Sequence, residues 1–487
     1  GRIIPVPSAT FAQTNRRHKF KVQSNSRGRI KVTWYAKAMT SLVSYLFTSA
    51  STQIANCVKD LRSSEASLVE IARERYASIP HDISNVHLEL IDTRIPHSAV
   101  PIKDNSKGGG CQIFPQDELI VHGVKVVDKS FTNKQNETPP LVMLHGYANG
   151  CLYFYRNLVS LSQTHFPTIY ALDMLGWGLS SRPKFETVPD NTSVESAEAF
   201  FVESLEAWRE KNQIDKMMLA GHSMGGYISV AYAEKYPQRV ERLILLSPVG
   251  VPENKIDDLA NFVNALPFTT RLALKTFRFM FGQGITPSMF LRSMPQSRSK
   301  QLVEGYVERR LPSIECPEEK SVLANYLHQN AMLPGSGEHC LSRILNPGAF
   351  AKKPLLYRIP LLNVKSVHFL YGQNDWMDAK GGIDVQKLCS ERRGDGSHSP
   401  QVHVYGVKNA GHLLMLENAD EFNSALIMAG GGEHALSPDS PKPEQFDYLN
   451  TNHEGFFRQS RLKAQQEKEQ ESADTVGDAT ESVQTTQ

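Results

Sequence analysis

The first 59 residues contain no aspartate or glutamate, although they hold ten lysines and arginines. Residues 60–487 carry 43 basic and 51 acidic side chains, so the formal net charge of +2 conceals two parts of opposite sign. A basic, acid-free segment with serine and threonine has the composition of a mitochondrial or plastid transit segment, or of a disordered basic arm. We therefore expect a mitochondrial or a cytoplasmic, peripheral membrane location, and slightly favour the mitochondrial one.

The chain also lacks a long uninterrupted apolar run. The most apolar early stretch, residues 38–58, is broken by Thr, Ser, Gln and Asn, whereas a membrane-spanning helix needs about 20 mostly apolar residues. We expect an interfacial or core-packed helix there. Hydrophobic residues at 40% and charged residues at 21% are ordinary for a globular protein, which excludes a mostly disordered or polytopic membrane protein.

Paired cysteines are absent too. The six cysteines form no CxxC pair and have no histidine nearby at zinc-finger spacing: Cys57, Cys111, Cys151, Cys316, Cys340 and Cys389. This usage is typical of reduced, intracellular cysteines and predicts no structural metal.

From about residue 85, short β-rich runs alternate with helical ones. The strand candidates are residues 86–91, 118–127, 140–146, 168–174, 216–223, 241–247, 364–372 and 402–406, and the helical candidates include residues 194–211, 225–236 and 419–428. This alternation predicts an α/β fold with a mostly parallel sheet and helices on both faces, which starts with an antiparallel pair.

One long interval between late strands breaks the alternation. An insertion of this length predicts a helical cap, which we place at residues 250–360. Residues 1–35 and the polar stretch after about residue 430 are expected to be unstructured. The predicted organisation is a basic segment at 1–59, an α/β domain at 85–430 with the cap inside it, and a disordered tail at 431–487.

The strongest local motif is GHSMGG at 221–226, which lies between an apolar run and a helical pattern. Small residues around a serine at a strand-to-helix turn allow the tight, strained backbone that exposes the hydroxyl beside a helix N-terminus. The motif therefore predicts a nucleophile elbow, with Ser223 as the nucleophile.

A serine hydroxyl needs an oriented base, and in this architecture the acid and then the histidine follow the serine along the chain. His412 follows the last strand candidate and precedes a helix, so it is the candidate base. Two carboxylates, Asp375 and Asp378, compete for the role of acid. We prefer Asp375 because it lies three residues beyond Gly372, just past the strand.

The segment LHGYA at 144–148 follows another strand candidate. We expect the backbone N–H of Tyr147 to pair with that of Met224 as an oxyanion hole, where each donor is worth about 10²–10³ in rate. Together these parts predict an α/β-hydrolase fold that uses serine acyl chemistry. Ser223 argues against the dehalogenase and epoxide hydrolase variants, which need aspartate at the elbow.

Four segments resemble the abhydrolase-domain 4/5 subfamily, and the resemblance spans about residues 85–430: DMLGWGLSSRPKF (173–185), residues 201–253, PGSGEHCLSRILNPGAFAKKPLLYRI (334–359) and GHLLMLENADEFN (411–423). RPKF and PGSGE are far more specific than GxSxG. The resemblance implies a lysophospholipase or phospholipase, a lysophosphatidic acid acyltransferase or a cardiolipin-specific deacylase. Some relatives carry asparagine at the elbow and act as lipase co-activators. This chain carries Ser223 there and so resembles the catalytic members.

The subfamily tends to carry His-x4-Asp, linked to acyl transfer, beginning at the catalytic histidine. Here Glu417, and not an aspartate, stands five residues after His412. The resemblance therefore does not decide whether water or a lysolipid is the acyl acceptor. His87–Asp92 and His434–Asp439 match the pattern, but about one chance match is expected in a chain of this composition.

Residues 259–303 are rich in cations, contain no acid and include interleaved Phe, Leu and Met. The cations are Arg271, Lys275, Arg278, Arg292, Arg298 and Lys300. They suit a phosphate headgroup with its acyl chains or an anionic bilayer surface, or else they form the solvated face of a lid helix. Arg271, Lys275 and Arg278 are the candidate headgroup contacts.

We favour a serine hydrolase that acts on acyl esters of phospholipids or lysophospholipids at a membrane or lipid-droplet surface. It is expected to need no cofactor and no metal and to bind no nucleic acid, while its oligomeric state stays open. The alternative is a non-catalytic, membrane- or lipid-droplet-bound regulator of another lipase, whose elbow is vestigial.

Overall fold

The computed structural model describes residues 30–77 (side chains from 51), 84–101, 118–131, 138–183, 193–253, 276, 280–450, 453 and 456. The chain divides into two compact units, Gly1–Gln53 and Ile54–Gln487, and the boundary falls within helix α1 (Ile30–Ala77). Across these described ranges, no helix combines the length and the apolar composition needed to cross a bilayer.

The described strands of the second unit form a nine-stranded sheet in the order β1-β2-β4-β3-β5-β6-β9-β10-β11. Their bounds are β1 Val86–Pro96, β2 Glu118–Asp128, β3 Leu141–Leu144, β4 Thr168–Leu172, β5 Met217–His222, β6 Val240–Leu246, β9 Ser366–Gly372, β10 Gln401–Val407 and β11 Glu444–Phe446. Neighbours from β4 to β10 pair in parallel, whereas β1 and β2 are antiparallel. The predicted parallel sheet and antiparallel start are confirmed.

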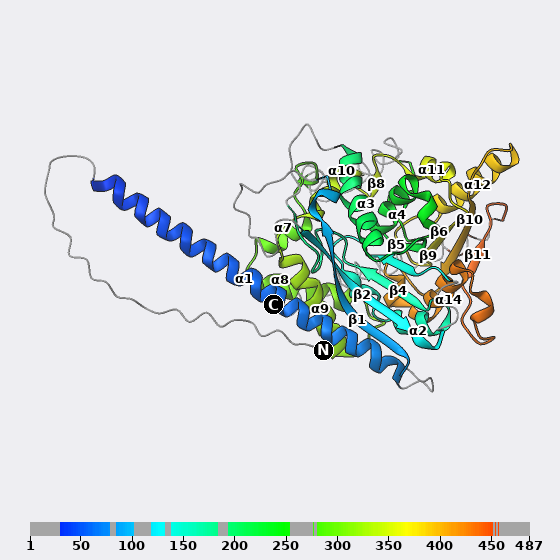
Figure 1. Ribbon diagram of the computed structural model, residues 1–487, viewed down its shortest axis with the longest axis horizontal. Helices are drawn as coiled ribbons and strands as arrows, with labels where there is room; N and C mark the ends of the chain where they lie inside the picture. Colours follow the sequence, from blue (N-terminus) through cyan, green and yellow to red (C-terminus); the bar gives the residue numbers. More distant parts are fainter. Residues whose placement is uncertain are drawn as a thin grey trace, which may run out of the picture. The chain divides into compact units, whose positions relative to one another are not determined.

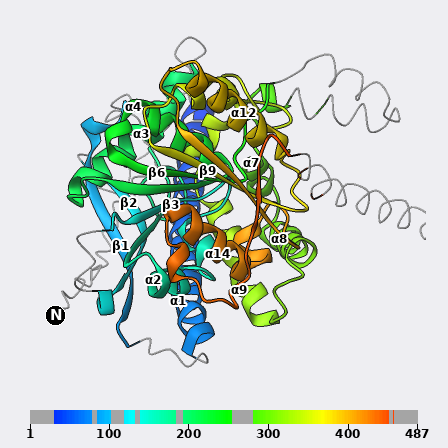
Figure 2. The ribbon, with the colours of Figure 1, turned by 90° about the vertical axis from the view of Figure 1, so that its right-hand side faces the viewer.

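Helices cover both faces of this sheet (Figure 2). One face holds α3 (Val194–Lys211), α4 (Met224–Lys235) and α12 (Lys380–Gly394), and the other holds α2 (Leu158–Thr164) and α14 (Ala419–Gly430). Local caps set the ends: Asn418 accepts a hydrogen bond from the N–H of Glu421 at the start of α14, and Gly431 ends it at φ +87°.

The interval between β6 and β9 is mostly helical where it is described, as predicted (Figure 1). It contains α7 (Pro287–Arg292), α8 (Gln296–Arg310), α9 (Pro317–Met332), α10 (Leu341–Ile344) and α11 (Leu355–Arg358), with a hairpin of β7 (Leu345–Asn346) and β8 (Phe350–Ala351). The hairpin strands have two residues each, too short for periodicity to reveal. Val303 and Val307 of α8 and Leu323 of α9 are buried in the core on the α2 side of the sheet.

Two predicted boundaries do not coincide with divisions in the structure. Residue 59 lies inside α1, and Cys57 and Leu61, one helical turn apart, are both buried in the core that contains the sheet residues. Residue 430 does not end the fold, because β11 pairs antiparallel with β10 and Phe446 packs against Phe456 with ring centroids 5.1 Å apart. The predictions for residues 1–29 and for most residues beyond 450 lie outside the described residues.

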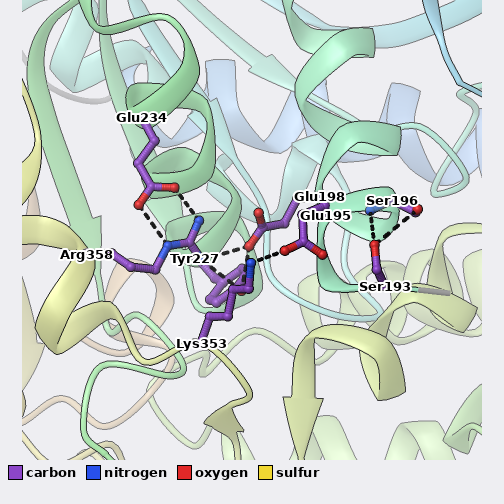
Figure 3. A network of polar contacts seen from close by, with 8 residues as sticks. All are labelled: Ser193, Glu195, Ser196, Glu198, Tyr227, Glu234, Lys353 and Arg358. Atoms are coloured by element: carbon purple, nitrogen blue, oxygen red, sulfur yellow. Dashed lines mark hydrogen bonds and ion pairs between the residues drawn. The ribbon is translucent and has the colours of Figure 1, made fainter.

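An ion-pair network ties the cap to the helix that follows the elbow (Figure 3). Arg358, at the end of α11, donates to Glu234 of α4 at 2.8 Å and to Glu198 of α3 at 2.7 Å. It also donates to the hydroxyl of Tyr227 at 2.9 Å, and only 12% of its side chain is exposed. Because α4 begins directly after Ser223, this network supports the position of the predicted nucleophile.

Candidate active site

Ser223 occupies a sharp turn between β5 and α4. Its φ of 54° and ψ of −113° are an uncommon conformation for a residue with a side chain, and such strain is characteristic of an elbow. Close packing around the turn explains the neighbouring glycines, since a Cβ on Gly225 would lie 2.6 Å from the carbonyl oxygen of His145. The elbow predicted from the motif is therefore present.

Three side chains from the carboxyl ends of β5, β9 and β10 meet at this turn. Nε2 of His412 lies 3.1 Å from Oγ of Ser223, and Nδ1 of His412 lies 3.1 Å from Oδ1 of Asp375. The Asp375 side chain is 1% exposed, and its Oδ2 makes no hydrogen bond in the described structure. The parallel sheet thus brings together residues that are up to 189 positions apart.

Asp378, the competing acid, has a different local partner. Its Oδ1 accepts a hydrogen bond from the N–H of Lys380 at 3.0 Å, where α12 begins. Asp375 also accepts a local bond, from the N–H of Met377 at 2.9 Å, so its carboxylate is held from two sides. The geometry therefore places Asp375 against His412, as preferred from the sequence.

The loop after β3 packs directly on the elbow. A Cβ on Gly146 would lie 2.8 Å from Nδ1 of His222 and 3.1 Å from Cβ of Ser223. His145 holds this loop because its Nδ1–H donates to the Gly146 carbonyl at 2.7 Å, while its Nε2 accepts from the N–H of Met174 at 3.0 Å. Burial lowers the pKa of His145, which keeps the ring neutral for both bonds.

The two predicted oxyanion donors flank the nucleophile. Met224 is the first residue of α4, so its N–H belongs to the first turn, whose N–H groups have no partner within the helix. Tyr147 follows Gly146, and its ring packs edge-on against Trp177 with centroids 5.1 Å apart. Met224 thus follows Ser223 in α4, and Tyr147 lies in the loop after β3 that packs on Ser223.

Two rings that we had not assigned contact His412. The Nε2–H of His222 donates to the backbone carbonyl of His412 at 2.9 Å, and the two rings lie 4.9 Å apart. Burial, followed by the nearby His412, lowers the pKa of His222 well below its usual range, so His222 stays neutral. The Trp376 ring centroid lies 5.0 Å from that of His412, and Trp376 is 57% exposed. The sequence hint for both was their position: His222 directly precedes Ser223, and Trp376 directly follows Asp375.

Glu417 supports the backbone around His412. Its carboxylate accepts hydrogen bonds from the N–H groups of Gly411 at 2.7 Å and of Leu413 at 3.1 Å, the residues on either side of the histidine. Burial raises the pKa of Glu417, although both bonds act in the opposite direction. Glu417, at the aspartate position of His-x4-Asp, therefore fixes the backbone on both sides of His412.

The two most specific sequence segments contact each other beside this site. Oγ of Ser336, in PGSGE, donates to the carbonyl of Pro183, in RPKF, at 2.5 Å, and Arg182 donates to the carbonyl of Pro334 at 2.9 Å. A Cβ on Gly337 would lie 2.7 Å from Nε1 of Trp177. Trp177 also packs on Tyr147, so these segments support the predicted oxyanion loop through Trp177.

A groove of about 240 Å³ is lined by residues that follow β6 and β9 and by the β7–β8 hairpin. Its apolar lining includes Val251, Phe350, Trp376 and Met377, and its charged lining residues are Asp378, Lys380 and Asp384. Trp376 lines this groove and also contacts the His412 ring, with ring centroids 5.0 Å apart, whereas Ser223 and His412 are not among the lining residues.

The cations predicted between residues 259 and 303 fall into two groups. Arg271, Lys275 and Arg278 lie outside the described residues. Of the remaining cations, Arg292 is ion-paired with the buried Glu338, whereas Arg298 and Lys300 are exposed on α8.

The α/β hydrolase fold family matches residues 139–419. A probable 1-acylglycerol-3-phosphate O-acyltransferase of Oryza sativa subsp. japonica is 31% identical over 361 residues, or 72% of this chain and 82% of the relative. The Homo sapiens 1-acylglycerol-3-phosphate O-acyltransferase ABHD5 is 33% identical over 317 residues, or 64% of this chain and 83% of the relative. Among solved structures, a bacterial membrane phospholipase A matches 82% of this chain and 100% of its own, with a TM-score of 0.46 and 18% identity. The chain belongs to the α/β-hydrolase family and, within it, to the abhydrolase-domain 4/5 subfamily.

Proposed function

We propose that this protein is a serine hydrolase that cleaves acyl esters of phospholipids or lysophospholipids. The observation that carries the proposal is the hydrogen-bonded line from Ser223 through His412 to the buried carboxylate of Asp375, with 3.1 Å at each step. A histidine held in this way can accept the serine proton and can be stabilised once it is positively charged.

The chemical steps follow from these positions. Oγ of Ser223 attacks the ester carbonyl carbon while Nε2 of His412 takes its proton, and the N–H groups of Tyr147 and Met224 stabilise the oxyanion. His412 then donates the proton to the leaving alcohol, which leaves the acyl group on Ser223. A water molecule, deprotonated by His412, releases the fatty acid; a lysolipid hydroxyl in its place would give acyl transfer.

Three observations favour a lipid ester. The relatives' names describe acyl transfer to 1-acylglycerol-3-phosphate, a lysophospholipid. The cap exposes large apolar side chains, with Phe290 at 54%, Leu302 at 46% and Tyr306 at 40% exposure. Arg298 and Lys300 lie exposed on the same helix as the last two, a combination that suits an anionic lipid surface. We therefore also propose peripheral binding to a membrane or lipid droplet, in mitochondria in preference to the cytoplasm.

The test uses purified protein, a panel of defined phospholipids and lysophospholipids, and mass spectrometry of the products. Ser223→Ala should lower deacylation by at least about 10⁴-fold, while Ser297→Ala, at an exposed cap position, should leave it unchanged. Unchanged deacylation in Ser223→Ala would contradict the proposal. Fatty acid as the product indicates water as the acceptor, and a newly acylated lysolipid indicates transfer.

The alternative, a lipase regulator with a vestigial elbow, is supported by the co-activator members of the resembled subfamily. An active-site fluorophosphonate probe separates the two proposals, because it reacts only with an activated serine. Labelling of the wild type that is lost in Ser223→Ala favours the enzyme; absence of labelling favours the regulator.

A further inference from the structure

Four buried side chains that are distant in the sequence converge behind the oxyanion loop. They are Glu65 of α1, His122 of β2, Cys151 of the 3₁₀ turn η3 (Cys151–Phe154) and Asp173, just after β4. One nitrogen, one sulfur and two carboxylate oxygens from this set all lie within 4.8 Å of one another. Every member is buried, and Glu65 is completely inaccessible to solvent. Among the described residues, this is the group of His, Cys, Asp and Glu close enough to share a metal ion.

The hydrogen bonding inside this cluster is incomplete. Glu65 forms an ion pair with His122, with Oε2 3.3 Å from Nε2, but neither carboxylate oxygen of Glu65 has a well-aligned hydrogen-bond partner, and neither does Nε2 of His122. A buried carboxylate without hydrogen bonds is costly unless a cation compensates it. Asp173 adds a further buried carboxylate, and the nearby Asp92 is already paired with Nδ1 of His122 at 2.6 Å.

In contrast to the absence of a structural metal predicted from cysteine spacing, we propose that Glu65, His122, Cys151 and Asp173 bind a divalent transition metal, for which Zn²⁺ is the best match. A set of imidazole nitrogen, thiolate sulfur and carboxylate oxygens suits Zn²⁺ and disfavours Mg²⁺ and Ca²⁺, which take oxygen ligands. Tetrahedral zinc with bonds of about 2.0–2.3 Å needs donors about 3.3–3.8 Å apart, so the side chains would draw together by about 1 Å.

The surroundings resemble those of a metal-binding histidine. Nδ1 of His122 lies 2.6 Å from Oδ1 of Asp92, an arrangement that orients the ring and leaves Nε2 facing the cluster. Asp173 is held as well, because its two oxygens accept from the N–H groups of Cys151 at 2.6 Å and of Leu179 at 2.8 Å. Binding converts the Cys151 thiol to a thiolate and takes neutral imidazole, so the protons they carry are released to solvent.

The metal would act structurally, since the cluster does not touch the reacting atoms. Cys151 lies four residues after Tyr147, and the preceding Asn149 carbonyl accepts a hydrogen bond from Asn330 of α9 at 2.8 Å. Coordination would therefore join α1, the sheet and the loop that carries a proposed oxyanion donor. This inference does not depend on the proposed catalytic activity.

Elemental analysis of the whole chain tests the site. The protein is produced in zinc-supplemented medium, and weakly bound metal is removed by dialysis before the measurement. We expect about one zinc per chain, reduced to background in Glu65→Gln and in Cys151→Ser. Cys340→Ser is the matched control, because Cys340 is equally buried but lies in the cap; it should keep the zinc. Removing the metal with a chelator should lower the unfolding temperature of the wild type by several degrees and that of Glu65→Gln not at all.

Cobalt substitution gives a second readout that does not depend on stability. The wild type should show a thiolate-to-cobalt charge-transfer band, which Cys151→Ser should lose and Cys340→Ser should retain. Wild-type protein that carries only background zinc and shows no thermal shift with added Zn²⁺ or Co²⁺ would overturn the proposal and leave a buried His–carboxylate ion pair. Zinc retained by both ligand variants would also overturn it, because the metal would then lie elsewhere.

Discussion

Exchanging Asp375 for asparagine separates the charge of the proposed catalytic acid from its shape. The Asp375 Oδ1 position accepts from both the His412 ring and the N–H of Met377, so an amide oxygen placed there keeps both hydrogen bonds. What is lost is the negative charge that stabilises the protonated histidine. For charge centres about 4 Å apart at an effective dielectric constant of about 20, that loss is about 4 kcal/mol, or about 10³ in rate.

The opposite amide orientation would be worse. If the amide nitrogen faced His412, it would donate to Nδ1 and select the tautomer whose Nε2–H cannot accept the Ser223 proton, which costs about 10⁴. Asp375→Asn should therefore slow the reaction at least about 10³-fold in either orientation. Asp378→Asn is the matched control, because asparagine can still accept from the Lys380 N–H.

The assay is the rate of fluorophosphonate labelling at Ser223, which needs the activated serine but not the natural substrate. Thermal unfolding shows whether each variant is folded. The reasoning is refuted if Asp375→Asn reacts within about tenfold of the wild type, or if Asp378→Asn is as slow as Asp375→Asn. The first result would mean that the buried carboxylate adds little to the base.

Three further substitutions test the supports around the site. Glu417→Gln can satisfy only one of the two N–H groups beside His412, so labelling should slow about tenfold. Burial raises the pKa of Glu417, so the wild type should exceed this variant in stability most below about pH 4, and the difference should shrink as pH rises through that raised pKa. Urea unfolding at two pH values measures this difference. Arg358→Ala leaves two carboxylates unpaired and should cost about 3 kcal/mol in the free energy of unfolding, and a loss below about 0.5 kcal/mol would show that the network is dispensable. Gly146→Ala places a methyl group 3.1 Å from Cβ of Ser223, so labelling should fall while secondary structure measured by circular dichroism is kept; undiminished labelling would mean that the loop shifts freely.

Local patterns account for most of the fold that could be predicted. Residues 194–211 were expected to be helical and are α3, and the apolar run before Ser223 is the fully buried β5. These predictions succeeded because helical spacing, unbroken apolar runs and small residues at a turn express themselves within one segment. The tail was misjudged at residue 431 because β11 is stabilised by pairing with β10, a partner that its own three residues do not reveal.

The proposed site divides in the same way. The sequence by itself determined the elbow at Ser223, the candidate histidine after the last parallel strand and the loop proposed to hold an oxyanion donor, because each lies at a strand end with its own turn chemistry. Only the tertiary structure set Asp375 against His412, made Glu417 a support of the histidine loop and gathered Glu65 and Cys151 into one buried cluster. The reason is that these relations depend on burial and on distances between segments, which follow from the packing of the whole sheet and its helices and not from any local pattern.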